Sequence, residues 1–376
     1  MLDHPDTIPS TRPHASQAQR LAWSLIVCTF KRENVLPRCV RCAIASTRRP
    51  SEVVIVDASP YWQTTRDAVL AEFESANPDI NFIYVGARRA SLTAQRNQGL
   101  ELASGDIAFM LDDDSLLFPD SAEKIMAVYD ADVENQVVAL TPIFVPEVPD
   151  AHLNLVTPGH PTQGHVSGDE SRASPLRKIM RKLLWSDLQL LPYDGREGIK
   201  PIPEHLREFN LIPTRFSTGS ATFRSEAVRT ARFEEMLERY AAGEDWDISE
   251  RIKHRGLIGF CPSSRQCHLE APGGRLGREV VFTLRYLNFM ALHILHSTDV
   301  DRSRRLYRQF LWRRVLSEAL ADLSELRWRV PRARGTWRAL KMHPLMFGRS
   351  RDEMRAWYPQ FQRELIAQGT KEDTAR

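Results

Sequence analysis

Apolar residues in the first third of the chain fall into short continuous runs that alternate with stretches of helical spacing. The apolar runs are residues 23–30, 52–59, 80–86 and 106–115. The stretches with helical spacing lie between them, at residues 35–46, 64–75 and 91–104. Buried strands that alternate with helices are typical of βαβ units, which build a mainly parallel sheet with helices on both faces. This pattern predicts an α/β fold.

Acidic residues stand at the ends of two of these predicted strands. Asp57 ends the second strand, and Asp112, Asp113 and Asp114 end the fourth. Ligands of open α/β sheets bind at the carboxyl ends of the strands. Like charges this close raise one another's pKa, so we expect the triplet to receive a cation. Alternation along a strand predicts Asp112 and Asp114 on one face and Asp113 on the other. A helix cap is the alternative interpretation, although a cap needs only one aspartate.

The pattern changes outside these units. The N-terminal residues are rich in Pro, Ser, Thr and His and have no periodicity, so we expect a disordered tail. Residues 145–214 also lack periodicity, apart from a basic amphipathic piece at 175–185, and we interpret them as an insertion that covers a substrate, in preference to a separate linker. The expected parts are a tail at 1–20, an α/β domain at 21–270 and a helical C-terminal region at 271–376.

Composition narrows the class of protein. The chain has 376 residues, of which 42% are hydrophobic and 26% charged, the balance of a soluble globular protein. A net charge of +3 is too small to indicate a nucleic-acid partner. The five cysteines, an odd number, favour a reducing compartment. Cys39 and Cys42 have the spacing of a zinc-ligand pair, but one helical turn also places both on one face, and we favour core packing.

The sequence has neither a secretory signal nor a membrane span. No apolar segment follows the polar N-terminus, and the longest apolar run, residues 280–295, contains Arg285 and Asn288 and is too short to cross a bilayer. We therefore predict a cytoplasmic protein.

Beyond Asp301, basic residues outnumber acidic ones by roughly two to one. Here we predict a helix that packs Leu306, Phe310, Leu311 and Val315 and presents charge on its other face. The arginines around them are Arg304, Arg305, Arg308, Arg313 and Arg314. One interpretation is a solvated face, and the other is a contact with anionic lipid or an anionic acceptor. The second predicts weak, salt-sensitive binding to anionic liposomes, with the protein peripheral at the inner face of the membrane.

Further candidate residues follow the loosely patterned segment. Glu244 and Asp245 stand at a predicted helix start, where acidic residues suit the helix dipole, or where one carboxylate accepts a proton from an attacking hydroxyl. Trp246 offers a flat apolar surface to a ligand or packs in the core, and we favour the core. His268 ends a predicted strand, as a structural residue or as a ligand of a cation.

Taken in order, these segments resemble the family 2 nucleotide-sugar glycosyltransferases, which have the GT-A fold. The match extends from about Trp23 to His268. The segments that carry it are a first strand and helix, a second strand ending at Asp57, an Arg-Asn-x-Gly segment from Arg96 to Gly99, a DxD motif at Asp112 to Asp114, a Gly-Ser pair at Gly219 and Ser220, an acidic pair at Glu244 and Asp245, and a strand ending at His268. Two features depart from the family pattern, because the second strand ends in a single acidic residue and residues 145–214 match nothing in it.

The resemblance implies a GT-A sheet with a C-terminal helical extension and a metal-dependent, inverting sugar transfer. The implied partners are a nucleotide-sugar donor and a glycan or lipid-linked acceptor, in cell-surface polysaccharide or glycolipid assembly. Asp245 is the expected base, with Glu244 next, and Asp114 and His268 would bind Mn²⁺ or Mg²⁺. The expected donor-binding residues are Thr29, Arg32, Asp57, Arg96, Asp112 and Asp113. The expected acceptor-side residues are Gly219, Ser220 and Trp246.

Two rival functions fit parts of this pattern. A phosphatase of the haloacid dehalogenase type also places DxD after an apolar strand, but here Ser115 and Leu116 follow Asp114, where Thr or Val is usual two places on. A noncatalytic carbohydrate-binding or scaffold protein of the same fold is the second rival. The presence of every acidic position argues against it.

Overall fold

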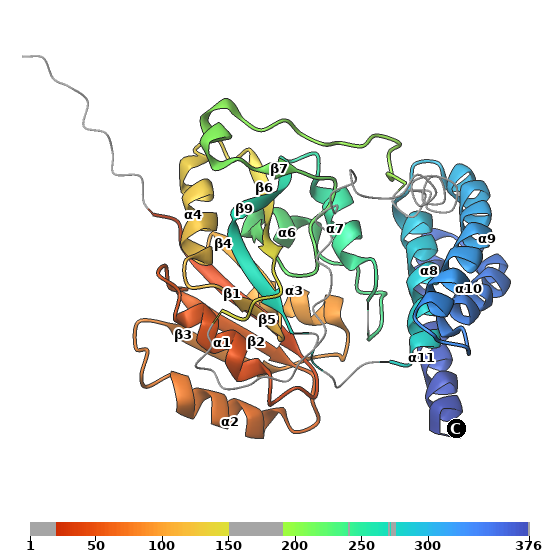
Figure 1. Ribbon diagram of the computed structural model, residues 1–376, viewed down its shortest axis with the longest axis horizontal. Coiled ribbons are helices and arrows are strands. Elements are labelled where there is room, and N and C mark those ends of the chain that lie inside the picture. The colour runs from red at the N-terminus through yellow and green to blue at the C-terminus, as the bar shows by residue number, and fades with distance from the viewer. Residues whose placement is uncertain (1–19, 150–190, 240, 270, 272–275, 375–376) are drawn as a thin grey trace, which may run out of the picture.

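The computed structural model describes residues 20–149, 191–239, 241–269, 271 and 276–374. Within these residues, the strands form one nine-stranded sheet with the order β3-β2-β1-β4-β8-β6-β9-β5, and β7 pairs with β9 (Figure 1). The strands are β1 Trp23–Thr29, β2 Glu52–Asp57, β3 Asn81–Gly86, β4 Ile107–Asp112, β5 Ser115–Leu117, β6 Val137–Phe144, β7 Ile212–Pro213, β8 Ala221–Arg224 and β9 Leu257–His268. The first four strands in this order are parallel, and β8 is antiparallel to β4 and β6. The predicted mainly parallel, mixed α/β sheet is confirmed.

Helices cover both faces of the sheet, as the uninterrupted apolar strands predict. They are α1 Leu36–Ile44, α2 Trp62–Phe73, α3 Leu92–Leu102, α4 Ser121–Ala131, α6 Ser225–Ala231 and α7 Glu244–Ile252, with a short 3-10 helix, η4, at Glu204–Phe209. In β1, Leu25 and Val27 face the core formed with α1, α2 and α4, whereas Ile26 faces the core formed with α3, α6 and α7. Alternate residues of one strand therefore enter two different cores.

The C-terminal part is helical, as predicted. It consists of α8 Arg278–His296, α9 Val300–Ser324, α10 Pro331–Met342, the 3-10 helix η5 His343–Met346 and α11 Arg351–Thr374. In Figure 1, α8 lies between the sheet and the pair α9 and α10. Trp246 of α7 is buried in the apolar core of these helices, so the preference for core packing of this side chain is confirmed. None of the helices in the described ranges is long and apolar enough to cross a membrane.

The structure corrects the predicted faces of α9. Tyr307, Phe310 and Leu311 are buried, but Leu306 is only half-buried. Arg314 does not present its charge to solvent, because its guanidinium contacts the Glu318 carboxylate and donates to the Tyr286 hydroxyl at 2.9 Å. Helical periodicity places Glu318 one turn from Arg314, but it could not show that both side chains are buried against α8.

The cysteines follow the core-packing interpretation. Cys39 and Cys42 lie on α1, both buried, and all five cysteines are free thiols. Burial raises the pKa of Cys39 well above its usual range, so this thiol stays protonated at neutral pH. Residues 1–19 of the predicted tail and the basic piece at 175–185 lie outside the described residues.

Candidate active site

The register of the parallel strands brings the predicted residues to one edge of the sheet. Thr29 at the end of β1 lies beside Asp57 at the end of β2. On its other side, β1 pairs with β4, which ends at Asp112. The chain then turns through Asp113 and Asp114 into β5. The carboxyl ends of parallel strands share an edge, so three separate segments converge there.

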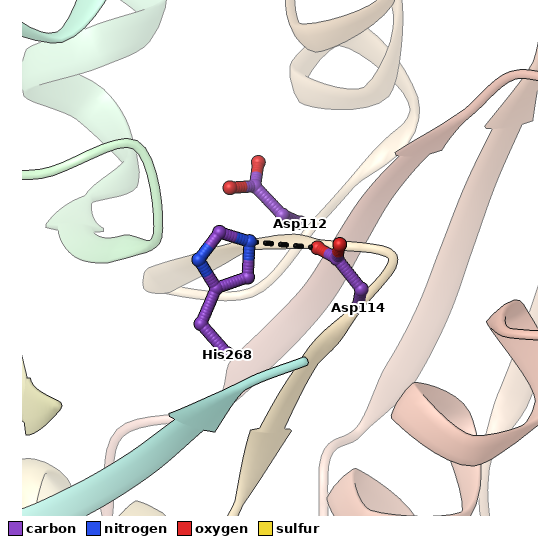
Figure 2. A group of neighbouring side chains, drawn as sticks. All are labelled: Asp112, Asp114 and His268. Carbon is purple, nitrogen blue, oxygen red and sulfur yellow. Dashed lines mark ion pairs between the residues drawn. The ribbon is translucent and has the colours of Figure 1, made fainter. Parts of the chain in front are cut away.

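A group that can hold a metal ion forms where β5 meets β9. Ser115 of β5 pairs with His268, the last residue of β9, and this pairing places the imidazole beside the aspartates. In Figure 2 the His268 imidazole faces the Asp114 carboxylate, and the Asp112 side chain lies next to both. One ligand atom from each lies within 4.8 Å of the others, and His268 Nε2 is 3.0 Å from Asp114 Oδ1. The chain therefore brings together residues that are 156 positions apart, as the strand-end histidine predicted.

The donor atoms of this group fit a divalent cation. Asp114 Oδ1 is buried and has no well-aligned hydrogen bond, although His268 Nε2 is close to it. The Asp112 side chain is partly exposed and keeps oxygen lone pairs available. Carboxylate oxygens with one imidazole nitrogen suit Mn²⁺, and carboxylates with water suit Mg²⁺.

Arg32 balances the charge of the other aspartates. Its Nη1 lies 2.6 Å from Asp113 Oδ1 and 3.0 Å from Asp114 Oδ2. Thr29 also donates to Asp113, at 2.7 Å. Burial raises the pKa of Asp113 to about 6, against the opposing effect of Arg32. Burial also acts to raise the pKa of Asp114, but His268 and Arg32 hold it below its usual value. Side chains of the protein thus already supply part of the positive charge that we expected a bound cation to bring to the triplet.

Arg96 connects the group that can hold a metal ion, which we call the metal-type group (Asp112, Asp114 and His268), to the acidic pair Glu244 and Asp245. Its Nη1 donates to Glu244 Oε1 at 2.8 Å, and its Nη2 lies 3.4 Å from Asp112 Oδ1. Nη2 also donates to the carbonyl oxygen of Gly219 at 2.7 Å. A methyl group at Gly219 would lie within 4 Å of Asp112, Arg96 and Glu244, so this glycine stands among all three side chains. One buried guanidinium therefore holds α3, β4, the Gly-Ser segment and α7 together.

The Arg-Asn-x-Gly segment holds Arg96 in this place. Asn97 donates to the carbonyl oxygen of Phe233 at 2.9 Å and accepts from its N–H at 2.8 Å, which fixes α3 to the chain before α7. Gly99 faces β1, where a Cβ would lie 2.5 Å from Ile26 Cγ2. Only a glycine lets α3 lie this close to the sheet.

Glu244 and Asp245 begin α7, as predicted. Gly243 has a φ of 98°, a left-handed conformation that favours glycine and turns the chain into the helix. Burial and the neighbouring Asp245 charge raise the pKa of Glu244 to about 8, against the effect of Arg96. Burial also raises the pKa of Asp245, which the Trp246 N–H and the Arg96 and Arg285 charges partly oppose. Asp245 is only half-buried, so its carboxylate is the more accessible of the two.

Asp57 and Ser220 have partners within the fold. Asp57 is buried and accepts hydrogen bonds from the Tyr84 hydroxyl and the Ser59 N–H, both at 2.7 Å. The Ser220 hydroxyl accepts from the Asp112 N–H at 3.0 Å and lies 2.9 Å from the Ser115 hydroxyl. Ser220 therefore positions the backbone that carries Asp112.

Sequence reasoning missed two residues near these sites. Tyr84 stands in the apolar run of β3, where nothing in the pattern separates it from a core residue. Arg285 interrupts the longest apolar run, and we read it only as a barrier to membrane insertion. That interruption was a usable signal, because α8 carries this exposed arginine near enough to Asp245 to lower its pKa.

Comparisons with known proteins agree with this architecture. The model of the family "Glycosyl transferase family 2" matches residues 24–181. The structure of GalNAc-T7 with UDP, GalNAc and Mn²⁺ superimposes with a TM-score of 0.50 and 16% identity, over 90% of this chain and 58% of that one. Mannosyltransferase PcManGT from Pyrobaculum calidifontis, in complex with GDP-Man and Mn²⁺, superimposes with a TM-score of 0.48 and 14% identity, over 90% of this chain and 88% of that one.

A third solved structure, residues 1–349 of S. aureus TarS in complex with UDP-GlcNAc, gives a TM-score of 0.45 and 15% identity over 94% of this chain and 92% of that one. The alignment with a longer S. aureus TarS chain spans 43% of that chain's length. No curated protein matches the chain by sequence. The chain is thus similar to glycosyl transferase family 2 over residues 24–181, which is less than half of its length, and its strand order and the likeness to GalNAc-T7 show a fold of the GT-A type.

Proposed function

We propose that this protein is a metal-dependent, inverting glycosyltransferase, and that it transfers a sugar from a nucleoside-diphosphate sugar to an acceptor hydroxyl. One observation carries the proposal. Arg96 connects Asp112, a member of the metal-type group, to Glu244, which is adjacent to Asp245. Groups suited to bind a diphosphate and a group suited to accept a proton therefore stand on opposite sides of one guanidinium.

The charge of the leaving group explains the first half of this arrangement. A nucleoside diphosphate departs with at least two negative charges, and Asp112, Asp114 and His268 would hold the divalent cation that neutralises them as a Lewis acid. Arg32 keeps the neighbouring Asp113 and Asp114 in place through ion pairs of 2.6 and 3.0 Å. GalNAc-T7 and PcManGT were both solved with Mn²⁺ and a nucleotide or nucleotide sugar, which supports the choice of ligand.

The acceptor half requires a base. Asp245 would take the proton from the acceptor hydroxyl as that oxygen attacks the anomeric carbon from the face opposite the diphosphate, which inverts the configuration. Its raised pKa makes it a stronger base than an ordinary aspartate. Glu244 is the second candidate, but it is more buried and its Oε1 accepts from Arg96.

The remaining assignments follow from position. Thr29, Arg32 and Asp57 line the donor end of the sheet, where the Asp57 carboxylate is oriented by Tyr84. Gly219 and Ser220 lie between the two halves of the site. The acceptor is a glycan or a lipid-linked glycan of surface polysaccharide or glycolipid assembly. We further propose that residues 21–270 are the catalytic domain, with the insertion at 145–214 on the acceptor side, and residues 271–376 the helical region.

A binding and turnover experiment tests the proposal. Nucleoside diphosphates with Mn²⁺ should raise the melting temperature of the wild-type protein, because a ligand that binds only the folded state stabilises it. Release of nucleoside diphosphate from a panel of nucleotide sugars should require Mn²⁺ or Mg²⁺. Asp114→Asn should lose both effects, whereas Asp79→Asn, at an exposed aspartate distant in sequence, should keep them.

Two results would contradict the proposal. A folded Asp114→Asn protein that binds UDP or GDP with Mn²⁺ as the wild type does would remove the metal assignment. Absence of metal-dependent release from every donor, with normal nucleotide binding, would favour a noncatalytic carbohydrate-binding protein.

A further inference from the structure

The side of α9 that faces away from the protein carries large exposed apolar side chains. They are Trp312, Leu316, Leu320 and Leu323, which we call the outer face of α9. Spacings of four, four and three residues place them on one side of a helix. The opposite side of α9 is buried, with Tyr307, Phe310 and Leu311 in the C-terminal core. The helix is therefore apolar on two sides, and the described residues cover only one of them.

Tryptophans of the neighbouring segments extend this outer face. Trp337 of α10 contacts Trp312 edge to face, with ring centroids 5.3 Å apart, and both rings are exposed. Trp328 lies between the two helices with 77% of its surface exposed. In Figure 1, α9 and α10 lie on the side of α8 away from the sheet, so this surface is remote from the strand-end site. Exposed apolar side chains that gather on one helix and include tryptophans in contact indicate an interaction site.

Between Arg302 and Leu323, the exposed charges of α9 have one sign. Arg305 and Arg308 lie about two turns and one turn before Trp312 on the same side of α9, Arg313 follows it, and all three are exposed. Between Arg302 and Leu323, the acidic residues of α9 are Glu318 and Asp322, and both are buried. Among the described residues, no carboxylate pairs with Arg305, Arg308 or Arg313. Within this stretch α9 thus offers apolar and positive groups and no exposed negative ones. The exposed Asp301 precedes the stretch, and Glu325, which follows it, pairs with Arg327 and Arg332.

We propose that the outer face of α9, with Trp328 and Trp337, is a docking surface for an anionic lipid bilayer. Tryptophan and leucine insert at the level of the headgroups, and the arginines around them attract anionic lipid. A second copy of this chain fits less well, because two such surfaces would bring arginines together with no carboxylate to receive them. The contact differs from a purely electrostatic one, since the apolar side chains provide part of the affinity.

Vesicle cosedimentation of the full chain tests this surface. The vesicles are neutral phosphatidylcholine alone or with roughly a third phosphatidylglycerol, at low and high salt. We expect wild-type protein to bind the anionic vesicles and to bind less as salt rises. The triple variant Trp312→Ser, Leu316→Ser, Leu320→Ser should reduce the partition coefficient by about tenfold or more at either salt concentration. A matched double variant, Tyr61→Ser with Val133→Ser, removes exposed apolar residues elsewhere and should bind as the wild type does.

A second variant separates charge from apolar contact. Arg305→Gln, Arg308→Gln, Arg313→Gln should weaken binding mainly at low salt and should flatten its salt dependence. Brominated lipid should quench less of the tryptophan fluorescence in Trp328→Phe than in the wild type. The three arginines changed to glutamine are all exposed, so the triple glutamine variant should keep the melting temperature of the wild type.

Either of two outcomes would overturn the proposal. Vesicle binding that the serine variant retains in full, in a folded protein, would place the contact elsewhere. A wild-type dimer in light scattering that the serine variant abolishes, with no binding to vesicles, would make this surface an interface between two copies. The readout is independent of sugar transfer, so Asp245→Asn should bind vesicles as the wild type does.

Discussion

Two groups of arginines in this protein have opposite surroundings. Arg32 and Arg96 lie at the strand ends, and each contacts two carboxylates of the chain. Arg305, Arg308 and Arg313 lie on α9, and no described carboxylate pairs with them. Arginines of the first group hold the site together before any ligand binds. Those of the second group leave positive charge available to a partner outside the chain.

The first prediction tests the internal group at its most connected member. Arg96→Met leaves the buried Glu244 without its cation and removes a donor to the Gly219 carbonyl. Breaking a buried pair in this way costs about 3–5 kcal/mol. The free energy of unfolding, measured by urea denaturation above the pH of about 8 at which Glu244 titrates, should fall by that amount.

A double variant checks the cause of this loss. Adding Glu244→Gln to Arg96→Met removes the unpaired charge, so part of the stability should return. A loss below about 1 kcal/mol in Arg96→Met alone would mean that the guanidinium contributes little to the fold.

The second prediction concerns the base. Asp245→Asn keeps the shape of the side chain and removes its proton acceptor, so donor binding should persist while turnover falls by a factor on the order of a hundred or more. Glu244→Gln should reduce turnover less, because Asp245 remains. Steady-state assays with saturating donor measure both variants. Near-normal turnover in Asp245→Asn, with a large loss in Glu244→Gln, would exchange the two roles.

The sequence predicts much of the site because its residues stand at the ends of regular elements. Once Thr29, Asp57 and Asp112 are assigned to the ends of parallel strands, their proximity follows from the geometry of the sheet. His268 could also be assigned to a strand end, although β5, the strand that pairs with it, spans only Ser115–Leu117. Such a short strand carries too little pattern to predict its partner.

Contacts between side chains distant in sequence could not be predicted in this way. The Arg96 and Glu244 pair joins two helices whose spacing and sequence are each ordinary. Periodicity likewise gave the inner face of α9 but not the burial of Arg314, which depends on Tyr286 of α8. The exposed face of α9 was missed because exposed Leu and Trp look like core residues in a one-dimensional pattern.

The third prediction uses pH to measure how far Arg96 offsets the burial of Glu244. The folded-state pKa of Glu244 is about 8, above its ordinary value of 4.5. Between these values the folded protein holds a proton that the unfolded chain releases, so wild-type stability should fall as pH rises through this window. Glu244→Gln does not titrate, and its stability relative to the wild type should therefore rise from pH 4.5 to about 8 and stay level below 4.5.

Urea denaturation of both proteins across this range measures the difference. A constant difference between Glu244→Gln and the wild type would mean that Arg96 fully compensates the buried carboxylate. Asp245→Asn offers a control, because it removes the neighbouring charge that helps to raise the Glu244 pKa. In the Asp245→Asn protein the folded-state pKa of Glu244 should be lower, so the pH range over which stability changes should narrow.

The last and smallest effect is expected in the outer group of arginines. Arg313→Met makes the same substitution as Arg96→Met, but at an exposed side chain that pairs with no described carboxylate. Surface substitutions of this kind change the free energy of unfolding by about 0.5 kcal/mol or less. Urea denaturation of the two variants under one condition compares the groups directly. If Arg313→Met proved as destabilising as Arg96→Met, the arginines of α9 would be part of the fold, and their charge would not be available to a membrane.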